Sequence, residues 1–174
     1  MTTAIIGVGN LLVADDGVGI RVVRELRRMI DDPRVVCAES ERGGLDLLDY
    51  LEGMDRGIVV DAAATGVHPP GSITRFTLRQ PFIPGGCPSL HALSIDAVLS
   101  LGSSAGMPLP DEVILYAVEA ADIESFGAGC TGDVEPAIPE LVAMVQEDLR
   151  TFLPDLLAVS ETGANHNAEN ITQA

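Results

Sequence analysis

The chain has 174 residues, of which 47% are hydrophobic and only 3% aromatic, and its formal net charge is −16. This length is typical of one domain with a full core, here an aliphatic one. The acidity disfavours nucleic acid and anionic membranes as partners. No apolar run reaches the length of a transmembrane helix, and no basic region precedes the first apolar stretch, so no signal peptide is expected either.

The three cysteines, Cys37, Cys87 and Cys130, are odd in number and lie far apart in the sequence. This spacing argues against a disulfide framework and is typical of a protein kept in a reducing compartment. We therefore expect a cytoplasmic protein.

The first half of the chain alternates between strand patterns and helix patterns. Apolar residues recur at helical spacing in some segments and form short buried runs in others. The predicted elements are strand 3–9, helix 18–30, strand 34–39, helix 44–54 and strand 57–64, the last of which is apolar until Asp61.

The second half continues the alternation. The predicted elements are strand 73–78, helix 89–102 with Ser89 as its N-cap, strand 112–118 and a last helix with an apolar stripe from Ile138 to Phe152. The apolar stripe of helix 89–102 is expected to consist of Leu90, Ala97 and Leu101. Strand 73–78 alternates polar and apolar residues, as an edge strand does. The pattern predicts a three-layer α/β domain over residues 1–155, with a mostly parallel twisted sheet of about five strands and helices on both faces. Residues 156–174 are predicted to form a polar, poorly ordered tail.

The segment GVGNLLVADDGVG, residues 7–19, first suggests a phosphate-binding loop. A dinucleotide fingerprint needs a third glycine against the strand and a free helix N-terminus. Here that position is Leu12, and the carboxylates of Asp15 and Asp16 oppose a diphosphate. Glu39 after the second strand nevertheless mimics a ribose-binding acid, so a Rossmann-like nucleotide-binding protein remains an alternative. The glycines are otherwise expected to carry Asp16 to the edge of the sheet and to let the helix start close to it.

Three polar residues are candidates for a divalent metal site. Asp16 opens a helix, Asp61 ends the apolar run of strand 57–64, and His91 is expected in the first turn of helix 89–102. In open α/β sheets ligands bind beyond the carboxyl ends of the strands. Two carboxylates and an imidazole leave coordination positions open and suit nickel or zinc better than calcium. The alternatives are that Asp15 or Asp16 caps the helix and that His91 is an ordinary surface histidine.

The glycine motif, the strand ending in Asp61 and the segment PSLHALSI together resemble the hydrogenase maturation protease family. These endopeptidases trim the C-terminal tail of a nickel–iron hydrogenase large subunit. The resemblance extends to about Leu153 and implies that Asp16, Asp61 and His91 are both metal ligands and catalytic residues. It also implies a twisted sheet between two layers of helices.

One segment departs from the family pattern. Many members carry a DGGT stretch after the second strand, whereas this chain has ESERGGLDLL, with Arg42 where threonine is expected. Gly43 and Gly44 keep the flexible character, and the three residues are the candidate substrate-binding set. Arg42 either meets a carboxylate of the precursor tail or is simply an exposed arginine.

The resemblance implies an unusual mechanism without a permanently bound cofactor. Nickel already present in the large-subunit precursor would be the recognition signal, and a metal- or carboxylate-activated water would attack the scissile bond. Two alternatives are a non-catalytic module that senses nickel and a cysteine protease in which Cys87, four residues before His91, is the nucleophile. No serine-hydrolase elbow occurs in the sequence.

Overall fold

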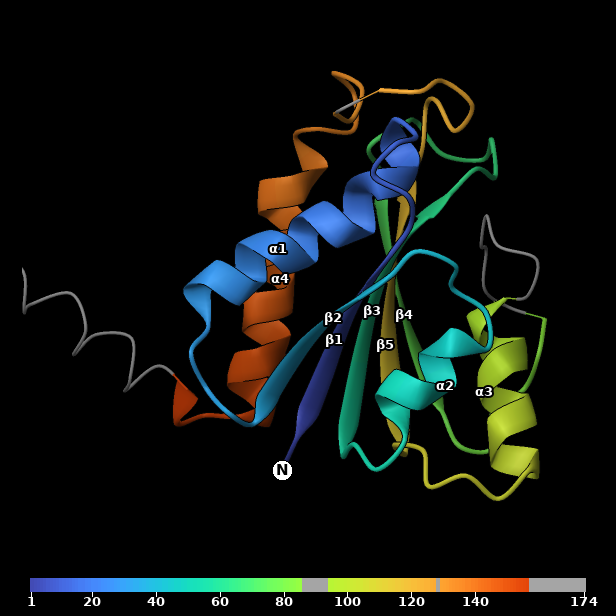
Figure 1. Cartoon of the computed structure of the whole chain (residues 1–174), viewed down its shortest axis with the longest axis vertical. Helices are drawn as coiled ribbons and strands as arrows, with labels where there is room; N and C mark the ends of the chain where they lie inside the picture. The colour runs from blue at the N-terminus through green and yellow to red at the C-terminus, as the bar shows by residue number, and fades with distance from the viewer. Residues whose placement is uncertain (86–93, 128, 157–174) are drawn as a thin grey trace, which may run out of the picture.

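The computed structural model describes residues 1–85, 94–127 and 129–156, which form three layers (Figure 1). The middle layer is a five-stranded sheet with the order β2–β1–β3–β5–β4. Its strands are β1 (Thr3–Val8), β2 (Val35–Ser40), β3 (Arg56–Ala63), β4 (Ile73–Arg79) and β5 (Glu112–Glu119). β4 runs antiparallel to β5, and all the other pairs are parallel. The predicted mostly parallel sheet is confirmed, with strand 73–78 at its edge.

Helices cover both faces of the sheet, as predicted. One face packs against α1 (Val18–Met29) and α4 (Ala137–Phe152), and the other against α2 (Asp46–Leu51) and α3 (Ile95–Ser104) (Figure 1). A 3-10 turn, η1 (Asp15–Gly17), leads into α1. Within the described ranges, no helix combines the length and apolarity needed to cross a membrane.

The two faces are built by strict alternation along the central strand. Ile58, Val60 and Ala62 of β3 belong to the core beneath α1 and α4, and Val59 belongs to the core beneath α2 and α3. Because successive side chains of a strand point to opposite faces, Asp61 points to the α2/α3 face. It lies near the carboxyl end of the strand, in register with Ala117 of β5.

The start of α3 differs from the prediction. Ser94 is its N-cap, in an extended conformation, so the helix start predicted at Ser89 was wrong and His91 precedes α3 in the chain. The buried stripe of α3 consists of Ile95, Val98, Leu99 and Gly102, at the spacing of one helix face. The predicted stripe, which assumes a helix start at Ser89, places Leu101 on the buried face of the helix, but Leu101 is 55% exposed. Residues 86–93 lie outside the described residues.

Glycines bring α1 against the sheet, as the motif predicted. A Cβ atom on Gly19 would lie 2.2 Å from the carbonyl oxygen of Val60 and 2.5 Å from that of Val8. A Cβ atom on Gly9, whose φ is 134°, would lie 1.7 Å from the carbonyl oxygen of Asp16. No side chain fits at either contact, so the backbone of this motif is fixed by steric exclusion.

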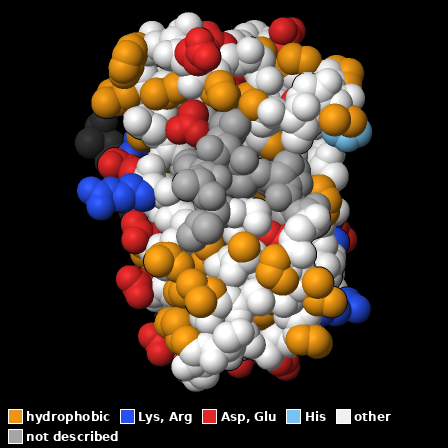
Figure 2. All heavy atoms as spheres, turned by 90° about the vertical axis from the view of Figure 1, so that its right-hand side faces the viewer, with side chains coloured by type: hydrophobic (Ala, Val, Ile, Leu, Met, Phe, Trp, Pro, Cys, Tyr) orange, Lys and Arg blue, Asp and Glu red, His pale blue; other side chains and the backbone are white. Residues whose placement is uncertain are grey.

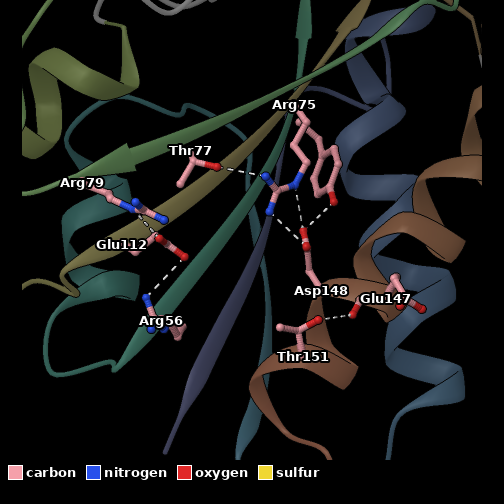
Figure 3. Close-up of polar contacts among 9 residues, drawn as sticks. Arg56, Arg75, Thr77, Arg79, Glu112, Glu147, Asp148 and Thr151 are labelled. Carbon is pink, nitrogen blue, oxygen red and sulfur yellow. Dashed lines mark hydrogen bonds and ion pairs between the residues drawn. The ribbon is translucent and has the colours of Figure 1, made fainter.

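The edge strand is fastened to α4 by a polar network (Figure 3). Arg75 of β4 forms an ion pair with Asp148 of α4 at 3.0 Å and lies over the ring of Tyr116 at 5.9 Å. The Tyr116 hydroxyl donates to the same carboxylate at 2.5 Å. Burial, together with the neighbouring Asp148, raises the pKa of Tyr116 far above its usual value. The phenol is therefore protonated at neutral pH and donates this hydrogen bond.

We predict that Gly19→Ala lowers the free energy of unfolding by about 3 kcal/mol, because the new methyl group forces α1 away from two backbone carbonyls. Urea denaturation measures this loss. The matched control is Gly132→Ala, since a Cβ atom there meets nothing within 4 Å. Equal stability of the two variants would contradict the close approach of α1.

Asp148→Ala is expected to lower the free energy of unfolding by about 2 kcal/mol, because it leaves the buried Tyr116 hydroxyl without its acceptor. Glu147→Ala is the neighbouring control. The Glu147 side chain is 71% exposed and pairs with Arg150 on the same helix, so its loss should change stability by less than about 0.5 kcal/mol. Chemical denaturation of both variants checks the difference, and equal losses would show that the network does not hold β4.

Candidate active site

The carboxyl edge of the parallel strands holds the candidate site. Asp16 lies in η1, between β1 and α1, and its side chain is half-buried. The backbone N–H of Asn10, just after β1, donates to Oδ2 of Asp16 at 2.7 Å. The turn folds back over the sheet, and η1 lies beside β3, the strand that carries Asp61.

Asp61 is 6% exposed and faces the layer formed by α2 and α3. The described residues on either side of the His91 segment lie in the same layer. Ser94 caps α3, and the N–H of Gly85 donates to Asp96 in the first turn of α3 at 2.8 Å. His91 itself lies outside the described residues. Among the residues that are described, no group of three His, Cys, Asp or Glu side chains is arranged to hold a metal. The ligand set Asp16, Asp61 and His91 therefore stays a prediction.

The adjacent Asp15 has a different environment from Asp16. Its side chain is fully buried, and its carboxylate accepts hydrogen bonds from the N–H groups of Ala121 and Asp122, both at 2.9 Å. It also accepts from the N–H of Thr131 at 2.6 Å and from the Thr131 hydroxyl at 3.0 Å. The N-cap of α1 is Gly17, and no side chain forms a capping hydrogen bond there. Neither Asp15 nor Asp16 therefore caps α1. Asp15 instead binds the connection between β5 and α4.

Backbone hydrogen bonds strengthen the same junction. Val13 pairs antiparallel with Phe126 as an isolated β-bridge. On either side of it, the N–H of Ala14 donates to Ser125 at 3.0 Å and the N–H of Gly127 donates to Leu12 at 3.1 Å. The loop that carries Asp16 is therefore tied to the β5–α4 connection by both backbone and carboxylate.

The candidate substrate-binding residues follow β2 at the same edge of the sheet. Gly43 and Gly44 have φ values of 55° and 60°, and the N–H of Gly43 donates to the buried hydroxyl of Ser40 at 3.1 Å. Arg42 is exposed and has no hydrogen bond or ion pair to another residue in the described part of the chain. Two successive left-handed residues explain the glycine pair, whereas a role of Arg42 in substrate binding remains a prediction.

Glu39 forms ion pairs that the sequence did not reveal. Its carboxylate accepts from Nη2 of Arg24 at 2.9 Å and from Nη1 of Arg27 at 2.6 Å. The hydrogen bond from Arg24 is the main cause of the lowered pKa of Glu39, and Arg27 adds to it. Glu39, which the sequence suggested as a possible ribose-binding acid, thus joins β2 to α1. This contact favours a structural role of Glu39 over nucleotide binding.

Sequence reasoning missed two further buried acids near the carboxyl edge. Glu119, the last residue of β5, accepts from the Thr65 hydroxyl at 2.6 Å and from the N–H of Gly66 at 2.7 Å. Burial opposes ionisation of Glu119, but these hydrogen bonds outweigh it and lower its pKa. Asp96 holds Gly85, as described above. Glu119 could have been identified from the sequence, because it is an acid at the end of an apolar run, as Asp61 is.

The described thiols are poor nucleophiles. Cys37 and Cys130 are free cysteines, and burial raises the pKa of both, that of Cys130 to about 11. Both are therefore protonated at neutral pH. Cys87, the cysteine considered as a nucleophile from the sequence, lies outside the described residues.

A mostly parallel sheet with a glycine-rich turn and acids at its carboxyl edge is typical of α/β domains that bind ligands at that edge. The chain belongs to the hydrogenase maturation protease family, whose model matches residues 20–148. It is accordingly a maturation endopeptidase, a peptide-bond hydrolase, which confirms the resemblance seen in the sequence.

Individual relatives agree with this assignment. The chain is 32% identical to the hydrogenase expression/formation protein HupD of Bradyrhizobium diazoefficiens, over 77% of this chain and 70% of the relative. It is 30% identical to the hydrogenase 2 maturation protease of Escherichia coli K12, over 84% and 92% of the two chains. The solved structure of the hydrogenase maturating endopeptidase HybD of E. coli superposes with a TM-score of 0.75 at 25% identity, covering 88% of this chain and 94% of HybD.

The two adjacent aspartates should respond differently to amidation. We predict that Asp15→Asn lowers the free energy of unfolding by about 2–3 kcal/mol, because an amide has one acceptor oxygen and turns its NH₂ group toward N–H donors. Asp16→Asn should cost less than about 1 kcal/mol, since its oxygen can still accept from Asn10. Urea denaturation of both proteins measures this contrast. A stability loss that is larger for Asp16→Asn would contradict the assignment of Asp15 as the structural acid.

Proposed function

We propose that this endopeptidase removes the C-terminal extension of a nickel–iron hydrogenase large-subunit precursor after nickel insertion, in the cytoplasm. Asp16, Asp61 and His91 bind the nickel of the precursor, and the protease itself holds no permanent cofactor. The observation that carries the proposal is the position of the Asp16 turn beside β3, which brings the carboxylate-bearing loop to the strand of Asp61.

The donor chemistry fits a metal that arrives with its substrate. Two carboxylates and one imidazole occupy only part of a nickel coordination sphere, so the precursor's own ligands complete it. A set this small binds a free ion weakly, which makes the loaded precursor the preferred ligand. The positive charge of the nickel also offsets the repulsion that an acidic partner meets from a protein of net charge −16.

Hydrolysis then needs a water molecule beside the aligned peptide bond. Its oxygen attacks the carbonyl carbon, the carbon–nitrogen bond breaks, and a proton passes to the leaving amine. One of the carboxylates would accept the first proton from this water, and the nickel of the precursor, if it holds the water, would lower the pKa of that water and so ease the transfer. Asp61 is suited to hold its orientation during the reaction, because it projects from a central strand with neighbours on both sides.

Arg42, Gly43 and Gly44 are proposed to receive the precursor tail. Their loop follows β2 at the carboxyl edge, where the tail must pass. The exposed guanidinium of Arg42 offers two parallel hydrogen bonds to a carboxylate of the extension.

The test mixes the purified protein with nickel-loaded and nickel-free precursor and follows release of the C-terminal peptide by mass spectrometry. We expect cleavage of the loaded precursor alone. Equal cleavage of both forms would contradict recognition through nickel. Tight binding of the loaded precursor without cleavage would instead identify a nickel-sensing module.

Asp16→Asn, Asp61→Asn and His91→Ala are each expected to slow processing by about 100-fold, because each removes one donor to the nickel. Asp49→Asn is the control, since it changes the same charge on an exposed face of α2. Denaturation curves establish that the variants remain folded. Full activity of all three variants would exclude these residues from the site.

A further inference from the structure

Two large hydrophobic side chains are exposed beside the candidate site. Phe126 is 86% exposed and Leu12 is 68% exposed. They project from the two loops that the Val13–Phe126 bridge joins. Figure 2 shows hydrophobic side chains along the upper rim of the molecule and others across the lower half of the same face. An aromatic side chain held this far into solvent is typical of a surface that binds a partner.

A hollow of about 530 Å³ lies next to these side chains. Its lining residues come from the β1–α1 loop, from α1 itself and from the distant connection between β5 and α4: Leu11, Leu12, Arg21, Arg24, Phe126 and Gly127. Three of these residues, Leu11, Leu12 and Phe126, are large and apolar, and two are arginines of α1. This docking hollow, as we call these six residues, therefore combines an apolar surface with positive charge.

The positive charge is local and contrasts with the rest of the protein. Arg27 follows on the same helix, and the described acid that pairs with Arg24 and Arg27 is Glu39. The two arginines that line the hollow, Arg21 and Arg24, thus lie in a chain whose net charge is −16. A partner that presents a carboxylate beside an apolar side chain complements the hollow, and the acidic remainder of the protein disfavours acidic partners elsewhere.

The docking hollow is built before any partner binds. The bonds of Asp15 and of the Val13–Phe126 bridge hold its two loops together, and the ion pairs of Glu39 hold Arg24. A preformed surface loses little conformational entropy on association, so its contacts contribute more fully to affinity.

The position of the hollow indicates which part of the substrate it receives. Its arginines belong to α1, which covers one face of the sheet, whereas Asp61 points to the opposite face. A peptide segment that reaches Asp61 is therefore not the segment that fills the hollow. The two sites nevertheless share one loop, because Leu12 and Asp16 both lie between β1 and α1.

We propose that the docking hollow binds the folded body of the hydrogenase large-subunit precursor, outside its C-terminal extension. It takes an apolar side chain that stands beside a carboxylate on the precursor surface, and so presents the nickel site to Asp16. This inference rests on the proposed function, since the occupant is the proposed substrate.

The test measures binding and cleavage of nickel-loaded precursor by Phe126→Ser and Leu12→Ser. Each variant should raise the Kd and the KM about tenfold while kcat stays within twofold, because the contact is equal in the ground state and the transition state. Leu101→Ser is the control, since Leu101 is 55% exposed on α3 and lies outside the hollow. Wild-type affinity of both hollow variants would overturn the proposal.

Two further ligands separate the possible occupants. Mature large subunit without the extension should compete for binding and should lose affinity for Phe126→Ser to the same degree as the precursor. A loss confined to a synthetic extension peptide would overturn docking of the folded body. Sedimentation of the protease alone gives a third readout, and a dimer that Phe126→Ser dissociates without changing precursor binding would assign the hollow to a second copy of this chain.

Failure of this inference is distinguishable from failure of the proposed function. If the wild-type protein cleaves the precursor and the hollow variants bind it normally, only the docking site is wrong. If the wild-type protein binds the precursor through the hollow without cleaving it, the hydrolytic function is wrong and the docking site stands. If the wild-type protein does not bind the precursor, both are wrong.

Discussion

The buried carboxylate of Asp15 is the interaction on which the functional edge of this protein depends. It is fully buried and accepts four hydrogen bonds from the connection between β5 and α4. A buried charge is tolerated only when its oxygens are satisfied, and here the donors belong to a segment more than a hundred residues away. The interaction therefore joins the β1–α1 loop to the connection between β5 and α4. The position of Asp16 and the shape of the docking hollow both follow from it.

The two faces of the sheet divide the tasks of the site. Asp61 and the start of α3 lie on one face, where the peptide bond of the substrate is proposed to be cut. The arginines of α1 lie on the other face, where the body of the substrate is proposed to dock. The glycine motif connects the two, because its backbone crosses the edge of the sheet between them. Steric exclusion at Gly9 and Gly19 makes that crossing rigid, which keeps the two sites at a fixed separation.

Arginine resolves the electrostatic difficulty of so acidic a chain. Arg24 and Arg27 neutralise Glu39, Arg75 neutralises Asp148, and the guanidinium groups of Arg56 and Arg79 both reach Glu112 (Figure 3). Each of these pairs joins two different elements of secondary structure, so positive charge is placed where it fastens the fold. A guanidinium is well suited to this use because its planar fork donates several hydrogen bonds at once.

The parallel strands could be predicted from the sequence because each contains a short apolar run, and the edge strand β4 because its polar and apolar residues alternate. Family membership could also be predicted, since the glycine motif depends on a backbone geometry that few other residues permit, and Asp61 stands out as a charged residue at the end of an apolar run. The start of α3 could not be predicted from the sequence. Leu90, Ala97 and Leu101 also occur at helical spacing, although the buried stripe of α3 begins at Ile95. Only packing against the sheet determines which of the two sets is buried.

The distinct roles of Asp15 and Asp16 were equally beyond the sequence. Neighbouring residues of the same type have the same chemistry, and their difference arises from which donors surround them. The sequence by itself determined that the chain is an α/β domain with acids at the carboxyl edge of its sheet. Only the tertiary structure decided which acid is structural, because the N–H groups that satisfy Asp15 come from a distant loop, and no local pattern records a contact between segments so far apart in the chain.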